Sequence, residues 1–217
     1  MMRERTQIGD YIRELCLPED SALDTFEQDV AAAGMLAIQV PAELGKLLGM
    51  LVRLTGARRV LEIGTLGGYS AAWMARALPS DGRVVTLEKS TKHAAFARTF
   101  LERAGVGDKV EIMLGAALDT LPSLLERGDP QFDMVFIDAD KAAYPAYLDW
   151  SLRLVRSGGV IVGDNVLRGG KVLEPGDDAD LNGLAEFNLH ATSSPLLDAL
   201  IIPNRSGEDG ILVAVVK

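Results

Sequence analysis

Short runs of apolar residues recur along the chain from residue 58 onward, and segments with helical periodicity separate them. The runs that we expect to form strands lie at residues 59–63, 83–88, 109–114, 134–137 and 159–163. Continuous apolar strands joined through helices are typical of a parallel sheet whose two faces are both covered. The pattern therefore predicts an α/β fold with helices on both faces of a mostly parallel sheet.

The C-terminal part of the chain departs from this alternation. Two further apolar runs, residues 196–202 and 211–216, are separated by a segment too short to hold a crossover helix. Strands joined by so short a connection pair antiparallel. We therefore expect a seven-stranded sheet that ends in an antiparallel hairpin.

The N-terminal part looks helical throughout, from about residue 6 to residue 56. Leucines such as Leu44, Leu48 and Leu51 recur at helical spacing, and Gly56 is suited to cap the last helix. We expect one domain over residues 1–217, composed of a helical part at 1–56 and an α/β core at 58–217.

Composition narrows the function classes. The chain has 217 residues and a net charge of −9, which disfavours broad binding to nucleic-acid phosphates. One cysteine, Cys16, excludes an intrachain disulfide, and two histidines, His93 and His190, exclude a histidine-rich zinc site. No apolar run approaches the roughly 20 residues that cross a bilayer, and the N-terminus lacks a signal-peptide core, so we expect a cytoplasmic protein.

A glycine-containing loop follows the first predicted strand, with the sequence Glu62-Ile63-Gly64-Thr65-Leu66-Gly67-Gly68-Tyr69-Ser70. Glycines allow a tight turn and a close approach of ligand to backbone, and the next helix would offer free N–H groups. A dinucleotide fingerprint would need glycine at position 66, so a smaller nucleoside fits better. Any tight strand-to-helix turn also favours glycine, and the loop alone does not decide between these readings.

Glu88 ends the second predicted strand, twenty residues after Gly68. A carboxylate at this place can accept hydrogen bonds from both hydroxyls of a ribose. An exposed acid at a strand end is the alternative. Loop and acid together favour a nucleoside cofactor.

Acidic and amide side chains follow the fourth and fifth predicted strands. Asp138 and Asp140 come after the fourth strand, and Asp164 and Asn165 come after the fifth. Adjacent strand ends would bring Asp138, Asp164 and Asn165 together as oxygen ligands, which suit Mg²⁺, Mn²⁺ or Ca²⁺. Helix capping is the alternative role for such acids.

Lys141 follows Asp138 by three residues. Repulsion from a neighbouring divalent cation favours the neutral form of a lysine, which can then act as a general base. The alternative is a salt bridge from Lys141 to Asp138 or Asp140.

Taken together, these motifs resemble the cation-dependent O-methyltransferases of the caffeoyl-CoA and catechol type, especially bacterial members. The resemblance covers nearly the whole chain and rests on Tyr11-Ile12-Arg13-Glu14, Met35, residues 60–64 and 67–70, Phe136-Ile137-Asp138-Ala139-Asp140-Lys141, Tyr144, Tyr147, Asp164-Asn165-Val166-Leu167, Phe187-Asn188 and Asp209-Gly210. It implies a Rossmann-like class I methyltransferase that moves a methyl group from S-adenosylmethionine to a hydroxyl of a small catechol-like or phenolic acceptor.

The resemblance also implies roles for individual residues. Metal ligands are Asp138, Asp164 and Asn165, and the general base is Lys141. Glu88 corresponds to the ribose-binding acid, and Ala117 lies under the adenine. The methionine part of the cofactor is held by Glu62, Gly64, Thr65 and Ser70. Further cofactor contacts are Val40, through its backbone, and Asp138, Asp140 and Tyr147.

Two departures from the family pattern bear on specificity. Leu44-Gly45-Lys46 stands where members often have Glu-Gly-Gln, and Arg168 stands where many have an aromatic residue. An arginine beside the predicted metal ligands would suit an anionic acceptor, although a solvent-facing loop arginine fits the position equally well.

Other functions and partners remain open. Some bacterial relatives methylate a hydroxylated uridine in transfer RNA; the acidic composition disfavours this, whereas Arg58, Arg59, Arg168 and Lys171 favour it. A third interpretation is a protein that binds the cofactor without turnover. A site that had lost its activity need not keep a complete set of catalytic and metal-binding residues, and this chain has all four: Asp138, Lys141, Asp164 and Asn165. The family tends to form dimers, so we expect a homodimer and no membrane partner.

Overall fold

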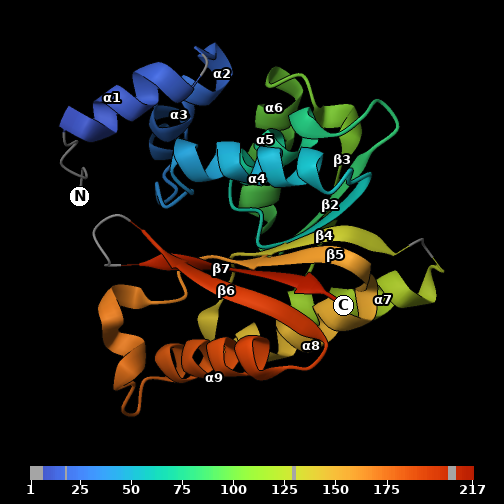
Figure 1. Ribbon diagram of the computed structural model, residues 1–217. Coiled ribbons are helices and arrows are strands. Elements are labelled where there is room, and N and C mark those ends of the chain that lie inside the picture. The colour runs from blue at the N-terminus through green and yellow to red at the C-terminus, as the bar shows by residue number, and fades with distance from the viewer. Residues whose placement is uncertain (1–6, 18, 129–130, 205–208) are drawn as a thin grey trace.

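The computed structural model describes residues 7–17, 19–128, 131–204 and 209–217, and it contains a seven-stranded sheet with helices on both faces (Figure 1). The strands are β1 (Arg59–Ile63), β2 (Arg83–Glu88), β3 (Val110–Leu114), β4 (Phe132–Ile137), β5 (Val155–Gly163), β6 (Leu197–Pro203) and β7 (Gly210–Val216). The helices are α1 (Gln7–Cys16), α2 (Ser21–Asp24), α3 (Phe26–Ala32), α4 (Ala42–Leu54), α5 (Tyr69–Ala77), α6 (Thr91–Arg103), α7 (Ala117–Glu126), α8 (Tyr144–Leu154) and α9 (Ala179–Ser193), with short 3₁₀ turns η1 (Gly107–Lys109), η2 (Lys141–Ala143) and η3 (Arg168–Leu173).

The strand order is β3-β2-β1-β4-β5-β7-β6. All neighbours from β3 to β5 are parallel, whereas β7 runs antiparallel to both β5 and β6. The predicted fold, including the C-terminal hairpin, is confirmed. The tip of that hairpin, residues 205–208, lies outside the described residues.

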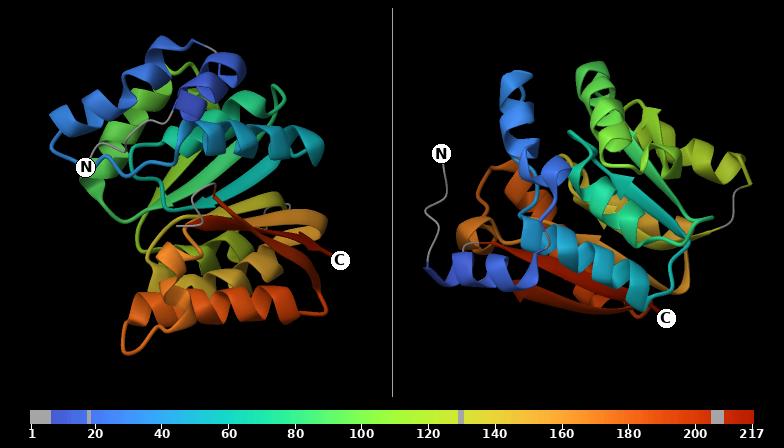
Figure 2. Two further views of the ribbon diagram at one scale, coloured as in Figure 1. Left: turned by 60° about the vertical axis from the view of Figure 1, so that its left-hand side comes forward. Right: turned by 90° about the horizontal axis from the view of Figure 1, so that it is seen from above.

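Alternate residues of each central strand enter different hydrophobic cores. In β1, Val60 packs with α4 and α5 on one face, whereas Leu61 and Ile63 pack with α7, α8 and α9 on the other. Figure 2 shows the two helical layers in its left view, with the blue helices above the sheet and the orange ones below. Side chains alternate across a strand, so strands that are apolar at every position bury both faces.

The N-terminal helical part differs from its prediction. Residues 33–41 are not helical and separate α3 from α4. Gly34 adopts a positive φ of 63°, and Pro41 stands at the N-cap of α4, so both residues interrupt helical geometry. The capping role predicted for Gly56 is confirmed, since its N–H bonds Arg53 O while the N–H of Ala57 bonds Val52 O.

The strand bounds also differ in detail. β4 and β5 begin earlier than their apolar runs, and the register between them shifts between Phe132 and Met134. β3 begins at Val110 because Lys109 belongs to the preceding 3₁₀ turn. No helix among the described residues has the length and apolar character needed to cross a membrane.

An aromatic cluster joins the N-terminal helices to the sheet layer. The ring of Phe26 in α3 lies 4.9 Å from that of Tyr69 and 4.6 Å from that of Phe100, measured between centroids. Phe26 is 1% exposed and belongs to the same core as Val60 of β1. The helical part and the α/β core therefore share buried surface.

We expect Phe26→Ala to lower the free energy of unfolding by about 3–5 kcal/mol, because the change leaves a large cavity in that shared core. Urea denaturation should show one cooperative transition shifted to lower urea. The control is Tyr11→Ala in α1, where the side chain is 61% exposed and the change should stay within about 0.5 kcal/mol. A separate early transition for the N-terminal part would contradict the prediction of one domain.

Candidate active site

The carboxyl ends of four parallel strands meet at one edge of the sheet. Backbone hydrogen bonds continue past the strands: Asp138 N donates to Ile63 O at 2.9 Å, and Asp164 N donates to Ile137 O at 3.0 Å. Parallel sheets bind ligands at this edge. The residues predicted from separate strand ends are therefore brought together.

Gly64 marks the tightest point of this edge. It has a φ of 101°, and a Cβ added there would lie 2.1 Å from the carbonyl oxygen of Asp138. Only glycine tolerates both the conformation and the contact. The loop after β1 can consequently lie directly against the end of β4.

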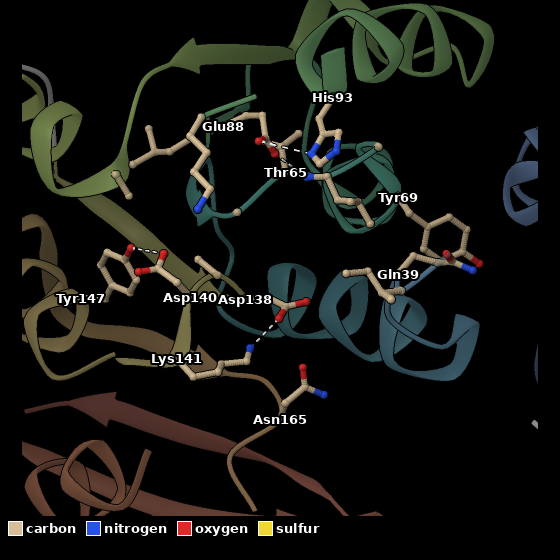
Figure 3. Close-up of a pocket in the computed structure, with 18 of the residues that line it drawn as sticks. Gln39, Thr65, Tyr69, Glu88, His93, Asp138, Asp140, Lys141, Tyr147 and Asn165 are labelled. Carbon is tan, nitrogen blue, oxygen red and sulfur yellow. Dashed lines mark hydrogen bonds and ion pairs between the residues drawn. The ribbon is translucent and has the colours of Figure 1, made fainter. Parts of the chain in front are cut away.

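A cavity of about 550 Å³ opens at this edge, a size typical of small-molecule sites. Among its lining residues are most of those predicted from sequence: Gly64, Thr65, Glu88, Ala117, Asp138, Asp140, Lys141, Tyr147 and Asn165. The other predicted residues, Val40, Glu62, Ser70 and Asp164, are buried and do not line it. In Figure 3, Glu88 and His93 lie at one end, and Lys141 and Asn165 lie at the opposite end.

Glu88 is fixed by the backbone around it. Its Oε2 accepts a 2.8 Å hydrogen bond from Leu66 N, and its Oε1 accepts one of 2.8 Å from Ser90 N. His93 Nδ1 lies 3.5 Å from Oε1. The carboxylate is therefore held in one orientation at the cavity wall, with capacity left to accept bonds from a bound molecule.

Glu62 lies below the glycine loop in a closed hydrogen-bond network. Its Oε1 accepts from Ser70 Oγ at 2.5 Å, and its Oε2 accepts from Thr86 Oγ1 at 2.6 Å. Thr65 Oγ1 lies 2.6 Å from Thr86 Oγ1. Burial raises the pKa of Glu62 to about 8, although the bonds from Ser70 and Thr86 oppose that shift. Glu62 and Ser70 therefore support the loop from beneath.

Lys141 is buried at the opposite end, where it makes three polar contacts. Its Nζ donates to Asp138 Oδ1 at 2.8 Å and to the Tyr144 hydroxyl at 2.6 Å, and lies 3.5 Å from Asp164 O. The Tyr144 hydroxyl lies 2.9 Å from Asp164 O and 3.0 Å from Ile137 O, either of which can accept its proton. Tyr144 thereby fixes the amine of Lys141 against the ends of β4 and β5.

The alternative role for Lys141, a salt bridge to Asp138, is present in this structure. Asp140 instead accepts a 2.8 Å hydrogen bond from the Tyr147 hydroxyl. Burial, followed by the hydrogen bond to Asp140 and the charge of that residue, raises the pKa of Tyr147, so this hydroxyl keeps its proton as a donor.

Two acids and one amide stand near Lys141 at the ends of β4 and β5. Asp164 is 6% exposed, and burial together with the negative charge of Asp138 raises its pKa to about 7. Asn165 has a positive φ of 57°, a conformation that asparagine tolerates better than most residues. In Figure 3 its amide points toward Asp138 and Lys141.

No group of three or more His, Cys, Asp or Glu side chains suited to a metal ion occurs among the described residues. The predicted set has only two acids and an amide, and its use by a cation stays a prediction.

The sequence analysis missed several polar residues of the cavity wall as site residues, among them Gln39 and His93. Gln39 follows α3 in the stretch that was expected to be helical, and its Oε1 is buried without a partner among the described residues. His93 lies one turn into α6, which Ser90 caps, and faces Glu88. His93 comes five residues after Glu88, in the first turn of the next helix, and this position could have indicated a contact between the two. Nothing in the sequence indicated that Gln39 lines the cavity.

The loop after β5 is tied to the C-terminal hairpin. Asp209 Oδ1 accepts hydrogen bonds from the N–H groups of Leu167 at 3.1 Å and Arg168 at 3.2 Å. Val166 N donates to Gly210 O at 3.1 Å. The hairpin therefore sets the path of the chain between Asn165 and Arg168.

Comparison with known proteins agrees with this arrangement. A family model described as O-methyltransferase matches residues 13–215. A catechol O-methyltransferase of Niastella koreensis is 46% identical over 213 residues, which are 97% of this chain and 96% of the relative. One from Mycobacterium tuberculosis is 49% identical over 209 residues, 95% and 94% of the two chains.

A solved O-methyltransferase from Bacillus cereus, in complex with SAH, has a TM-score of 0.93 and 44% identity, and the match covers 100% of both chains. The predicted class I methyltransferase fold is thereby confirmed. The chain belongs to the O-methyltransferase family.

Proposed function

We propose that this enzyme transfers the methyl group of S-adenosylmethionine to a hydroxyl of a small catechol-like acceptor, with the help of a divalent cation. The observation that carries the proposal is one cavity that holds an oriented carboxylate, Glu88, at one end and a buried amine, Lys141, at the other. The names of the relatives from Niastella koreensis and Mycobacterium tuberculosis support a catechol acceptor.

The residues of the cavity fit S-adenosylmethionine. Glu88 would accept the ribose hydroxyls, because its two oxygens are oriented by backbone N–H groups. The buried, unpartnered Oε1 of Gln39 would accept a further donor. Gly64 and Thr65 would line the methionine part of the cofactor, with Glu62 and Ser70 beneath them. The Bacillus cereus structure, which is in complex with SAH, supports S-adenosylmethionine as the cofactor.

The donor set also fits a divalent cation. Asp138, Asp164 and Asn165 offer oxygen atoms only, which hard cations prefer. Burial and the charge of Asp138 raise the pKa of Asp164, and a bound cation would oppose that shift. Mg²⁺ is the cation that we expect, and Mn²⁺ or Ca²⁺ would suit the same atoms.

The reaction is a displacement in which an O–C bond forms and the S–C bond breaks. When bound, S-adenosylmethionine supplies an electrophilic methyl group, and a divalent cation supplies positive charge that favours ionisation of the acceptor hydroxyl. Lys141 would take the hydroxyl proton at Nζ, while Tyr144 holds the amine in place. The cavity walls would hold the acceptor hydroxyl and the methyl group in line for the displacement.

A methyl-transfer assay over a panel of catechols, acyl-CoA phenolics and undermodified transfer RNA, with and without Mg²⁺, tests the proposal as a whole. We expect turnover of catechols only, and only with the cation. Turnover of the transfer RNA alone would replace the proposed acceptor. The homodimer and the cytoplasmic location stay predictions.

Glu88→Ala should weaken the binding of S-adenosylmethionine by about tenfold or more, since hydrogen bonds to a charged group are lost. Isothermal titration calorimetry measures the affinity. Glu102→Ala is a matched control, because Glu102 is an exposed acid of α6 that does not line the cavity. Equal affinities for wild type and Glu88→Ala would exclude the ribose role.

Removal of divalent cations should abolish methyl transfer, and Mg²⁺ should restore it. Asp164→Asn should raise the Mn²⁺ concentration that gives half-saturation, because one ligand charge is removed. Calorimetric titration with Mn²⁺ measures the affinity for the cation independently of turnover. Full activity after exhaustive dialysis against chelator would contradict the cation requirement.

Lys141→Ala should lower kcat by about 10²–10⁴-fold, the usual contribution of a general base, with little change in cofactor affinity. Lys171→Ala provides the control, since Lys171 is exposed and does not line the cavity. Near-normal kcat at saturating cation and cofactor would refute the base role without refuting the enzyme class. If Lys141 only neutralises Asp138, cation binding or stability should change instead.

A further inference from the structure

Arg168 stands at the mouth of the cavity. It follows Asn165 by three residues, is exposed, and lines the same cavity as Lys141 and Asn165. Across the part of the chain that the structure describes, no acid lies within ion-pair distance of its guanidinium. The guanidinium is thus exposed at the cavity and makes no ion pair with a described residue.

The backbone at Arg168 is unusual for a residue with a large side chain. Its φ is 47°, in the left-handed region that favours glycine, and the next two residues, Gly169 and Gly170, have φ of 69° and 76°. The bond from Arg168 N to Asp209 Oδ1 helps to hold this conformation. A strained backbone at a residue that lines the cavity motivates the hypothesis that its side chain has a role there.

The other charged residues near this end of the cavity already bind described residues, and a further cation is next to Glu88 in the chain. Lys141 is paired with Asp138, and Asp180, which also lines the cavity, accepts a hydrogen bond from Ala142 N at 3.1 Å. Lys89, which also lines the cavity, follows Glu88 in the chain, and Glu88 lies at the end of the cavity opposite to Asn165. Arg168 is thus the cation near Asn165 whose charge is not balanced by a contact with a described residue.

We propose that Arg168 binds a carboxylate of the methyl acceptor, so that the enzyme prefers catechol acids to neutral catechols. A guanidinium matches a carboxylate through two parallel hydrogen bonds, and this geometry gives specificity as well as affinity. The inference rests on the proposed function and adds the charge of the acceptor to it.

Two acceptors with the same catechol ring isolate that charge: 3,4-dihydroxybenzoate, which is anionic at neutral pH, and 3,4-dihydroxybenzamide, which is neutral. For the wild type, kcat/KM should be about tenfold or more higher with the benzoate. Arg168→Gln should lower kcat/KM for the benzoate by about 10- to 100-fold and leave the benzamide within about threefold. Arg168→Lys should retain part of the preference, because it keeps the charge but loses the paired geometry.

Two further variants separate recognition from loop structure. Lys171→Gln removes a cation from the same loop but outside the cavity, and both acceptors should be unaffected. Arg168→Gly removes the side chain and relieves the left-handed strain, so it should fold even if Arg168→Gln does not. It should lose the benzoate preference in the same way.

Equal losses on the two acceptors in every Arg168 variant would overturn the proposal, as would an unchanged preference. A wild type that methylates the benzamide better than the benzoate overturns this inference and leaves the proposed function standing. A wild type that methylates neither catechol overturns both.

Discussion

The close approach of two backbones is the constraint on which the site depends. Gly64 lies against the carbonyl of Asp138 with no room for a Cβ, so the ends of β1 and β4 meet without a side chain between them. The loop after β1 can then turn into α5 over the sheet edge. A larger residue at position 64 would separate the Glu88 end from the Lys141 end, and one cavity would no longer contain both.

Two buried ionisable side chains beneath this edge each have at least two hydrogen-bond partners. Glu62 is enclosed by Ser70 and Thr86, and Lys141 by Asp138 and Tyr144. Unpaired groups at these depths would cost several times what a hydrogen bond contributes. The networks therefore stabilise the fold and orient the cavity wall at once. The pairing of Lys141 with Asp138 also means that a cation bound to Asp138 would compete with the lysine for the same carboxylate.

Much of this arrangement could be read from the sequence because it follows from local patterns. Apolar runs predicted the strands, and the chemistry after each strand predicted which residues would share an edge. Asp133 interrupts the apolar pattern of β4, and Arg156, Ser157 and Gly158 interrupt that of β5, so the predicted strands are too short. Residues 33–41 contain enough apolar side chains to resemble a helix until Gly34 and Pro41 are placed in space. The family motif grouped Glu62 and Ser70 with the cofactor loop, but spacing could not show that both lie beneath it. That no described acid lies within ion-pair distance of the Arg168 guanidinium depends on long-range packing, which no short motif encodes.

The bond between Asp209 and the loop after β5 joins parts of the chain that are made at different times. Residues 165–168 leave the ribosome early relative to residues 209 and 210, on which their path depends. Until residues 209 and 210 are in place, the segment from Asn165 to Arg168 lacks the hydrogen bonds that fix its path. Glu88 is oriented instead by Leu66 and Ser90, neither of which belongs to the hairpin, so loosening of the hairpin would disturb the Asn165 end of the cavity and leave the Glu88 end in place.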